Sequence, residues 1–161
     1  MPEIKIRNAS QDDCPLILHF VRELAEYEKA LDEVIASRAD LETALFGPAP
    51  KAFGLICTVD GEVAGFAVYF FNFSTWLGKY GLFLEDLYVS PEYRGSGAGK
   101  ALLKYLARLA VENNCGRFEW NVLDWNKPAI DFYESFAAQP LSEWIGYRLT
   151  GEALSRFAAS E

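Results

Sequence analysis

The sequence contains little of what metal sites and disulfide frameworks are built from. Among its 161 residues there is one histidine, and its three cysteines, Cys14, Cys57 and Cys115, stand far apart. Structural zinc sites use closely spaced Cys and His residues, and disulfide frameworks use an even number of cysteines. We therefore expect no metal site, no disulfide framework and reduced thiols.

Positive charge is also scarce. Lys and Arg number 15 and Asp and Glu number 23, which gives a net charge of −8. Proteins that bind nucleic acids gain most of their affinity when Lys and Arg neutralise phosphates, so we expect no nucleic-acid partner. An acidic surface favours a cationic partner instead. Any anionic ligand must be held by a local group of donors.

Long apolar runs are missing as well. The longest run, Val63 to Phe71, is much shorter than the roughly 20 residues that a membrane helix needs. The first residues show no basic and then apolar pattern of a signal peptide. We expect a cytoplasmic protein with no membrane partner, folded as one domain over residues 1–161.

Hydrophobic periodicity predicts an α+β (mixed α/β) fold. Period-two patterns and turn signals predict strands, and four-residue spacings after capping residues predict helices. The expected strands begin at Ile4 and cover 51–59, 62–73, 82–89, 117–123 and 144–149; the expected helices follow Ser10 and Ser37, cover 97–114 and follow Asn126 and Thr150. Three consecutive strands indicate an antiparallel meander, and the strand–helix–strand unit around residues 97–114 indicates a parallel crossover. The prediction is a mixed sheet with helices on both faces.

The sharpest local motif lies between the strand 82–89 and the helix 97–114. It reads Tyr-Arg-Gly-Ser-Gly-Ala-Gly-Lys over 93–100. Alternate glycines allow a tight turn and expose backbone N–H groups beside a helix N-terminus, which favours an anion. Arg94 and Lys100 add local positive charge. The glycine spacing differs from both the P-loop and the dinucleotide-binding fingerprint.

The segment Arg94-Gly95-Ser96-Gly97-Ala98-Gly99 resembles the pyrophosphate loop of the GNAT acetyltransferase superfamily, Arg/Gln-x-x-Gly-x-Gly/Ala. Segments 23–28, 76–79, 84–89 and 125–133 are similar, in matching order, to the branch that contains spermidine/spermine and thialysine acetyltransferases. The resemblance covers nearly the whole chain. It implies a mostly antiparallel sheet with a splayed parallel pair, and direct acetyl transfer from acetyl-CoA to a primary amine of a small cationic substrate.

The resemblance also implies roles for particular residues. Tyr133 is the expected acid for the departing thiolate, Glu85 is expected at the amine, and Tyr27 and Glu28 are expected to bind the substrate. The expected acetyl-CoA contacts are Leu87, Tyr88, Val89, Arg94, Gly95, Ser96, Gly97, Ala98, Gly99, Lys100 and Asn126. Considered without the resemblance, the spacing of Tyr133 favours a core tyrosine, and Glu85 is equally well an ordinary strand acid. Strand alternation further predicts that Glu85 and Asp86 point to opposite faces of the sheet.

Two positions depart from the pattern of the polyamine enzymes. Ser74 and Ile145 stand where acidic residues are expected, so long polyamines are in doubt, whereas short diamines and lysine-like amino acids fit better. The branch implies a homodimer. A protein or peptide N-acetyltransferase and a non-catalytic acyl-CoA-binding module stay open as alternatives, and the sequence does not name the amine.

Overall fold

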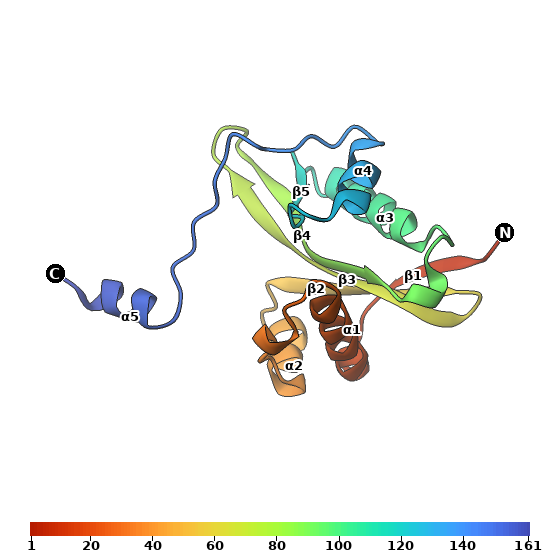
Figure 1. Cartoon of the computed structure of the whole chain (residues 1–161), viewed down its shortest axis with the longest axis horizontal. Helices are drawn as coiled ribbons and strands as arrows, with labels where there is room; N and C mark the ends of the chain where they lie inside the picture. The colour runs from red at the N-terminus through yellow and green to blue at the C-terminus, as the bar shows by residue number, and fades with distance from the viewer. The chain divides into compact units, whose positions relative to one another are not determined.

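The computed structural model describes residues 1–161 as two compact units, Met1–Leu123 and Asp124–Glu161. The first unit contains a five-stranded sheet in the order β1-β2-β3-β4-β5 (Figure 1). Its strands are β1 (Ile4–Asn8), β2 (Ala52–Val59), β3 (Glu62–Ser74), β4 (Lys79–Val89) and β5 (Phe118–Trp120). Its helices are α1 (Cys14–Tyr27), α2 (Arg38–Phe46) and α3 (Ala98–Glu112), with short 3₁₀ turns at Gln11–Asp13, Leu31–Glu33 and Pro91–Tyr93.

The sheet is mixed, as the sequence predicts. Strands β1 to β4 pair antiparallel with their neighbours, whereas β4 and β5 pair parallel over Leu82↔Phe118 to Leu84↔Trp120. Helices α1 and α2 lie on one face of the sheet and α3 lies on the other (Figure 1). The expected α+β architecture with helices on both faces is therefore confirmed.

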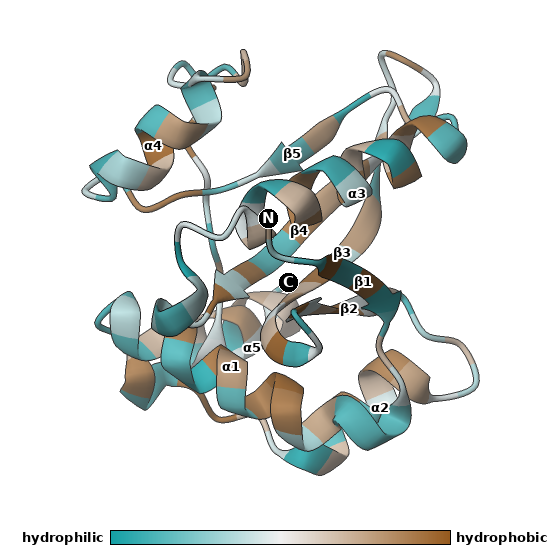
Figure 2. Cartoon of the chain, turned by 90° about the vertical axis from the view of Figure 1, so that its right-hand side faces the viewer, coloured by the Kyte–Doolittle hydropathy of each residue, from teal (hydrophilic) through white to brown (hydrophobic).

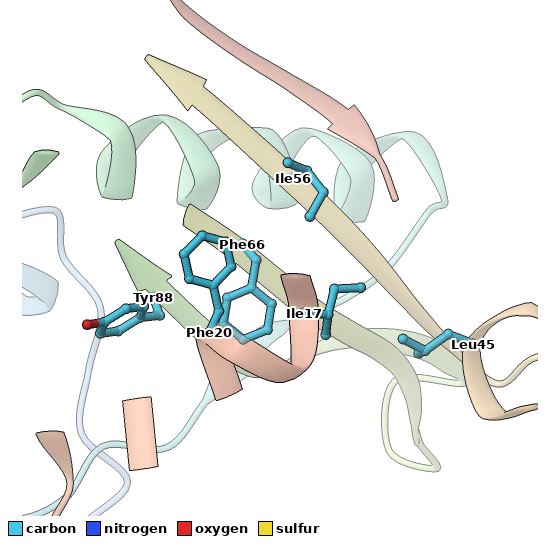
Figure 3. Close-up of a cluster of buried hydrophobic side chains, with 6 residues drawn as sticks. All are labelled: Ile17, Phe20, Leu45, Ile56, Phe66 and Tyr88. Atoms are coloured by element: carbon cyan, nitrogen blue, oxygen red, sulfur yellow. The ribbon is translucent and has the colours of Figure 1, made fainter. Parts of the chain in front are cut away.

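The core under α1 and α2 consists of aromatic and branched side chains. Phe20 and Phe66 stack with their ring centroids 5.5 Å apart, and Tyr88 lies 6.1 Å from Phe20. Ile17, Leu45 and Ile56 complete this cluster (Figure 3). The Tyr88 hydroxyl points away from the other five side chains, so the ring is part of the core while its polar end is directed elsewhere.

Helix α3 supplies the core on the other face. Leu102 and Leu106 are fully buried, as is Leu82 on β4. The four-residue spacing of Leu102 and Leu106 is the periodicity that predicts this helix. The exposed face of α3 carries Lys100 and Lys104. Figure 2 shows that hydrophobic and hydrophilic residues alternate along α1, α2 and α3. Amphipathic helices on both faces therefore bury the apolar residues of the middle strands.

The second unit contains α4 (Lys127–Glu134) and α5 (Gly151–Ala159) and no strand. The prediction of a strand over 144–149 is therefore wrong, and the strand predicted over 117–123 is limited to β5. Alternating apolar residues favour a strand only where another strand satisfies its backbone groups, and the second unit provides none. Trp144, Ile145 and Tyr147 are accordingly exposed.

A charged contact joins the end of β1 to the start of α1. The Arg7 guanidinium donates to both carboxylate oxygens of Asp13, at 2.7 and 2.9 Å, and Asp13 also accepts from the Ser10 backbone N–H at 2.7 Å. These hydrogen bonds stabilise the charged carboxylate and lower the pKa of Asp13 to about 2. Asp13 thus links the end of β1 to the start of α1.

Asp13→Asn should remove a stabilising term that depends on pH. Because the folded pKa lies below the unfolded value, this term is present above about pH 4 and is lost as the pH falls toward 2. Denaturant unfolding at pH 7 should show a loss of about 2 kcal/mol. The variant should also show less acid sensitivity than the parent between pH 4 and 2. Asp32→Asn, at an exposed position, is the control; equal acid sensitivity in all three proteins would contradict the assignment.

Candidate functional site

The glycine-rich segment forms a loop that leads directly into α3. Gly95 and Gly97 have φ of 82° and 92°, in the left-handed region that favours glycine, and Gly97 is the N-cap of the helix. The first N–H groups of α3 have no partner within the helix. A Cβ at residue 95 would meet nothing within 4 Å. We call residues Gly95–Lys100 the phosphate loop, because open space beside a helix N-terminus suits a pyrophosphate.

Strand β4 loses one neighbour halfway along its length. Its parallel pairing with β5 ends at Leu84↔Trp120, whereas β4 continues to Val89. Leu87, Tyr88 and Val89 pair only with β3, so the opposite edge of β4 offers backbone groups to a ligand. The splayed parallel pair that the resemblance implies is therefore present, and three of the residues expected to contact acetyl-CoA, namely Leu87, Tyr88 and Val89, lie on the free edge.

A β-bulge sits where this free edge begins. In the register with β3, Asp86 faces Val68 and Leu84 faces Tyr69, so Glu85 is an extra residue without a partner. Strict alternation, on which we based opposite faces for Glu85 and Asp86, therefore does not apply here. Asp86 shares the α1 face of the sheet with Tyr88, because their β3 partners Val68 and Phe66 both contact that core.

Three carboxylates gather beside this bulge. Burial, together with the negative charges of Glu85 and Glu28, raises the pKa of Asp86 to about 6. Burial alone raises the pKa of Glu28, which caps the C-terminus of α1. We call Glu28, Glu85 and Asp86 the acidic cluster. The structure thus places Asp86 near Glu28 and Glu85, the two carboxylates that the sequence predicts at the amine site. Sequence reasoning missed Asp86 because its burial is not visible in a sequence.

Two tyrosines border the acidic cluster. Tyr27 is the last residue of α1 and is 40% exposed, whereas Tyr88 is 7% exposed. Burial raises the pKa of the Tyr88 hydroxyl, and the nearby Glu23 carboxylate raises it further. The Arg94 guanidinium lies over both rings, 5.5 Å from the Tyr27 centroid and 5.6 Å from the Tyr88 centroid. The residue that begins the pyrophosphate motif therefore directs its side chain toward the end of α1.

The remaining predicted residues belong to the second unit or to a turn. Asn126 caps α4, its Oδ1 accepting from the Ala129 N–H at 3.4 Å, and Tyr133 lies in α4 with its ring 6.4 Å from that of Phe136. Ser74 is buried in the β3–β4 hairpin, where its hydroxyl accepts from the Leu77 N–H at 3.2 Å. That hydroxyl holds the turn together.

The structure offers no cluster of three or more His, Cys, Asp or Glu residues arranged to hold a metal ion. None of its helices combines the length and the apolar character needed to cross a bilayer.

Comparison with known proteins matches these features to one family. A sequence profile of the acetyltransferase (GNAT) family covers residues 17–138. The thialysine N-epsilon-acetyltransferase of Sus scrofa is 40% identical over 98% of this chain and 99% of its own. The spermidine/spermine N(1)-acetyltransferase-like protein 1 of Homo sapiens is 37% identical over 92% of this chain, but only 22% of its own length.

Among solved structures, an integron cassette protein from the mobile metagenome of V. cholerae superposes with a TM-score of 0.80 at 29% identity, covering 98% of both chains. The chain therefore belongs to the GNAT acetyltransferase family. It is an N-acetyltransferase, as its family and its full-length relatives indicate.

Asp86→Asn should stabilise the unliganded protein at neutral and alkaline pH. Because the folded pKa of Asp86 lies above the unfolded value, ionisation of this carboxyl costs stability as the pH rises from about 4 to 6. The variant should exceed the parent by about 1–3 kcal/mol at pH 8 and match it near pH 4 in denaturant unfolding. In the same measurement at pH 8, Asp13→Asn should be less stable than the parent. If Asp86→Asn is less stable than the parent at pH 8, the folded protein stabilises the charged carboxylate of Asp86 through a partner, and burial does not destabilise it.

Proposed function

We propose that this enzyme transfers the acetyl group of acetyl-CoA to a primary amine of a small cationic substrate, such as a diamine, a polyamine or a lysine-like amino acid. The acidic cluster carries this proposal, because Asp86, with a pKa of about 6, lies within reach of the negative charges of Glu28 and Glu85, and such a group suits a cation that must lose a proton. Full-length relatives named for thialysine support an amino-acid amine as substrate.

The residues of the first unit fit acetyl-CoA, which supplies the activated acetyl thioester. The phosphate loop offers backbone donors and open space to the pyrophosphate, and Lys100 adds positive charge. The free edge of β4 at Leu87–Val89 offers backbone groups to the pantetheine arm and to the acetyl carbonyl. Asn126 is proposed as a further contact, on the resemblance of the segment 125–133.

The acidic cluster addresses the main chemical difficulty of the reaction. A primary amine with a pKa near ~10.4 is unprotonated in only roughly one molecule in a thousand at pH 7. The amine nitrogen must lose a proton to attack the acetyl carbon, after which the C–S bond breaks. Asp86 is best matched to accept that proton, because a base works best when its pKa is near the working pH. Exposed Glu85 attracts the cation, and Tyr133 protonates the departing thiolate.

The substrate is proposed to be short. The expected acidic anchor positions hold Ser74, which is buried in a turn, and Ile145, which has no charge. The acidic cluster is thus the site for one ammonium group, and a long polyamine has fewer additional anchors. Tyr27 and Glu28 at the end of α1 are proposed to contact the amine. We also propose that the enzyme is a homodimer, as the resemblance to its branch implies, and that it is cytoplasmic, as we expect from its thiols.

A substrate screen tests the proposal directly. Purified enzyme and acetyl-CoA are mixed with putrescine, spermidine, thialysine, lysine and a panel of peptides, and free thiol is measured. Turnover should be highest with thialysine, lysine or putrescine. Preference for the peptides would establish a protein acetyltransferase instead. Tight acetyl-CoA binding without turnover on any amine would indicate a non-catalytic acyl-CoA-binding module.

Gly97→Val should abolish the approach of the pyrophosphate to the phosphate loop. The side chain would also be strained at φ 92°, costing about 1–2 kcal/mol of stability. Gly61→Val is the matched control, since Gly61 has φ 84° and lies in the β2–β3 turn. Both variants should lose similar stability, but only Gly97→Val should lose more than about tenfold in acetyl-CoA affinity by calorimetry. Equal affinities would remove the loop from the cofactor site.

Asp86→Asn and Glu85→Gln should separate proton acceptance from attraction of the amine. Without an acceptor, Asp86→Asn depends on amine that is already neutral, so its loss of kcat/KM should be largest near pH 7. That loss should shrink by about tenfold per pH unit on raising the pH. Glu85→Gln should raise the amine KM with kcat nearly intact. If Glu85→Gln shows the pH-dependent loss and Asp86→Asn does not, the two roles are reversed.

Tyr133→Phe should keep the ring and remove the hydroxyl that we propose as the acid. Turnover should fall by roughly 10²–10⁴, the range for a positioned acid, with little change in acetyl-CoA affinity. Phe132→Leu, a neighbouring change on α4 that leaves the hydroxyl, controls for disturbance of the helix. Turnover of Tyr133→Phe close to that of the parent would restrict Tyr133 to packing.

A further inference from the structure

Arg94 begins the pyrophosphate motif, yet the contacts of its guanidinium are with tyrosines and a carbonyl. Its Cζ lies 5.5 Å from the Tyr27 ring centroid and 5.6 Å from the Tyr88 ring centroid. Its Nε donates to the Val89 carbonyl at 3.3 Å. Arginine stacks well on aromatic faces because its guanidinium is planar and weakly hydrated. The side chain is therefore held by the end of α1 and the end of β4.

The two rings differ in how firmly they are fixed. Tyr88 is 7% exposed and packs within the core against Phe20, so its position does not depend on Arg94. Tyr27 is 40% exposed and ends a helix, where fraying is common. Arg94 can therefore affect the position of the Tyr27 ring more than that of the Tyr88 ring.

The acidic cluster lies on both sides of this contact. Glu28 follows Tyr27 directly in the chain, and Asp86 shares the α1 face of β4 with Tyr88. The negative charge of Glu28 contributes to the raised pKa of Asp86, so these two carboxyl groups repel when both are ionised. The stacking of Arg94 on Tyr27 and Tyr88 is an attractive contact that opposes this repulsion at the end of α1, in addition to the apolar packing of the helix.

We infer that Arg94 is a positioning residue for the amine: it holds Tyr27 and the end of α1 against β4, so that Glu28 and Asp86 face one substrate cation. This inference rests on the proposed function and assigns Arg94 a task on the amine side of the reaction. Because Arg94 precedes the phosphate loop directly, it also connects the acetyl-CoA site with the amine site.

Arg94→Lys and Arg94→Ala test this role together. Lysine keeps the positive charge but loses the planar stack and the Nε donor, so both variants should behave alike. Each should raise the amine KM by about 2- to 30-fold, the range for a cation–π contact, with kcat and acetyl-CoA affinity changed less than about twofold. Amide hydrogen exchange over residues 24–29 should become faster in both. Tyr27→Leu should reproduce these effects and should not add to those of Arg94→Ala.

Lys104→Ala is the control, since Lys104 is an exposed cation on α3 outside the loop, and it should match the parent in every measurement. If Arg94→Ala weakens acetyl-CoA binding while Arg94→Lys retains it, Arg94 is a phosphate ligand and the inference is wrong. Unchanged exchange over residues 24–29 in Arg94→Ala also overturns it. Failure of the proposed function is recognised separately, because the parent enzyme would then acetylate no amine in the screen.

Discussion

Backbone pairing between β4 and β5 lasts for only three residue pairs, and the rest of the site depends on where it stops. Up to Leu84 the two strands form an ordinary parallel pair. Beyond Leu84, β4 continues alone on that edge, while β3 still supports it on the other. A strand held on one side only is rigid enough to position a ligand and still has hydrogen-bonding groups to offer it.

The bulge at Glu85 lies where the pairing of β4 with β5 ends, and it also affects the site. One extra residue interrupts the alternation between Leu84 and Asp86, and beyond it Asp86 and Tyr88 share the α1 side of the sheet. There, burial and two neighbouring carboxylates raise the pKa of Asp86 to about 6. The fold thus keeps a costly group in place, which is characteristic of functional sites.

Arg94 connects this acidic region to the start of α3. Its side chain contacts α1 and β4, and its backbone leads into the turn formed by Gly95 and Gly97. An acidic cluster and an anion-binding helix start have opposite electrostatic preferences, and a chain of net charge −8 must keep them apart.

Much of this protein follows from local sequence alone. The spacing of Leu102 and Leu106 predicts α3, the alternate glycines predict the loop at its start, and the family motif leads to Glu85, Tyr27 and Glu28. These features depend on neighbours within a few residues, so periodicity and motifs reveal them. The importance of Asp86, the direction of the Arg94 side chain and the absence of a strand over 144–149 were decided by the tertiary structure. Each depends on burial, register or a pairing partner far away in the chain, and a strand pattern such as Trp144–Leu149 does not reveal whether a partner exists.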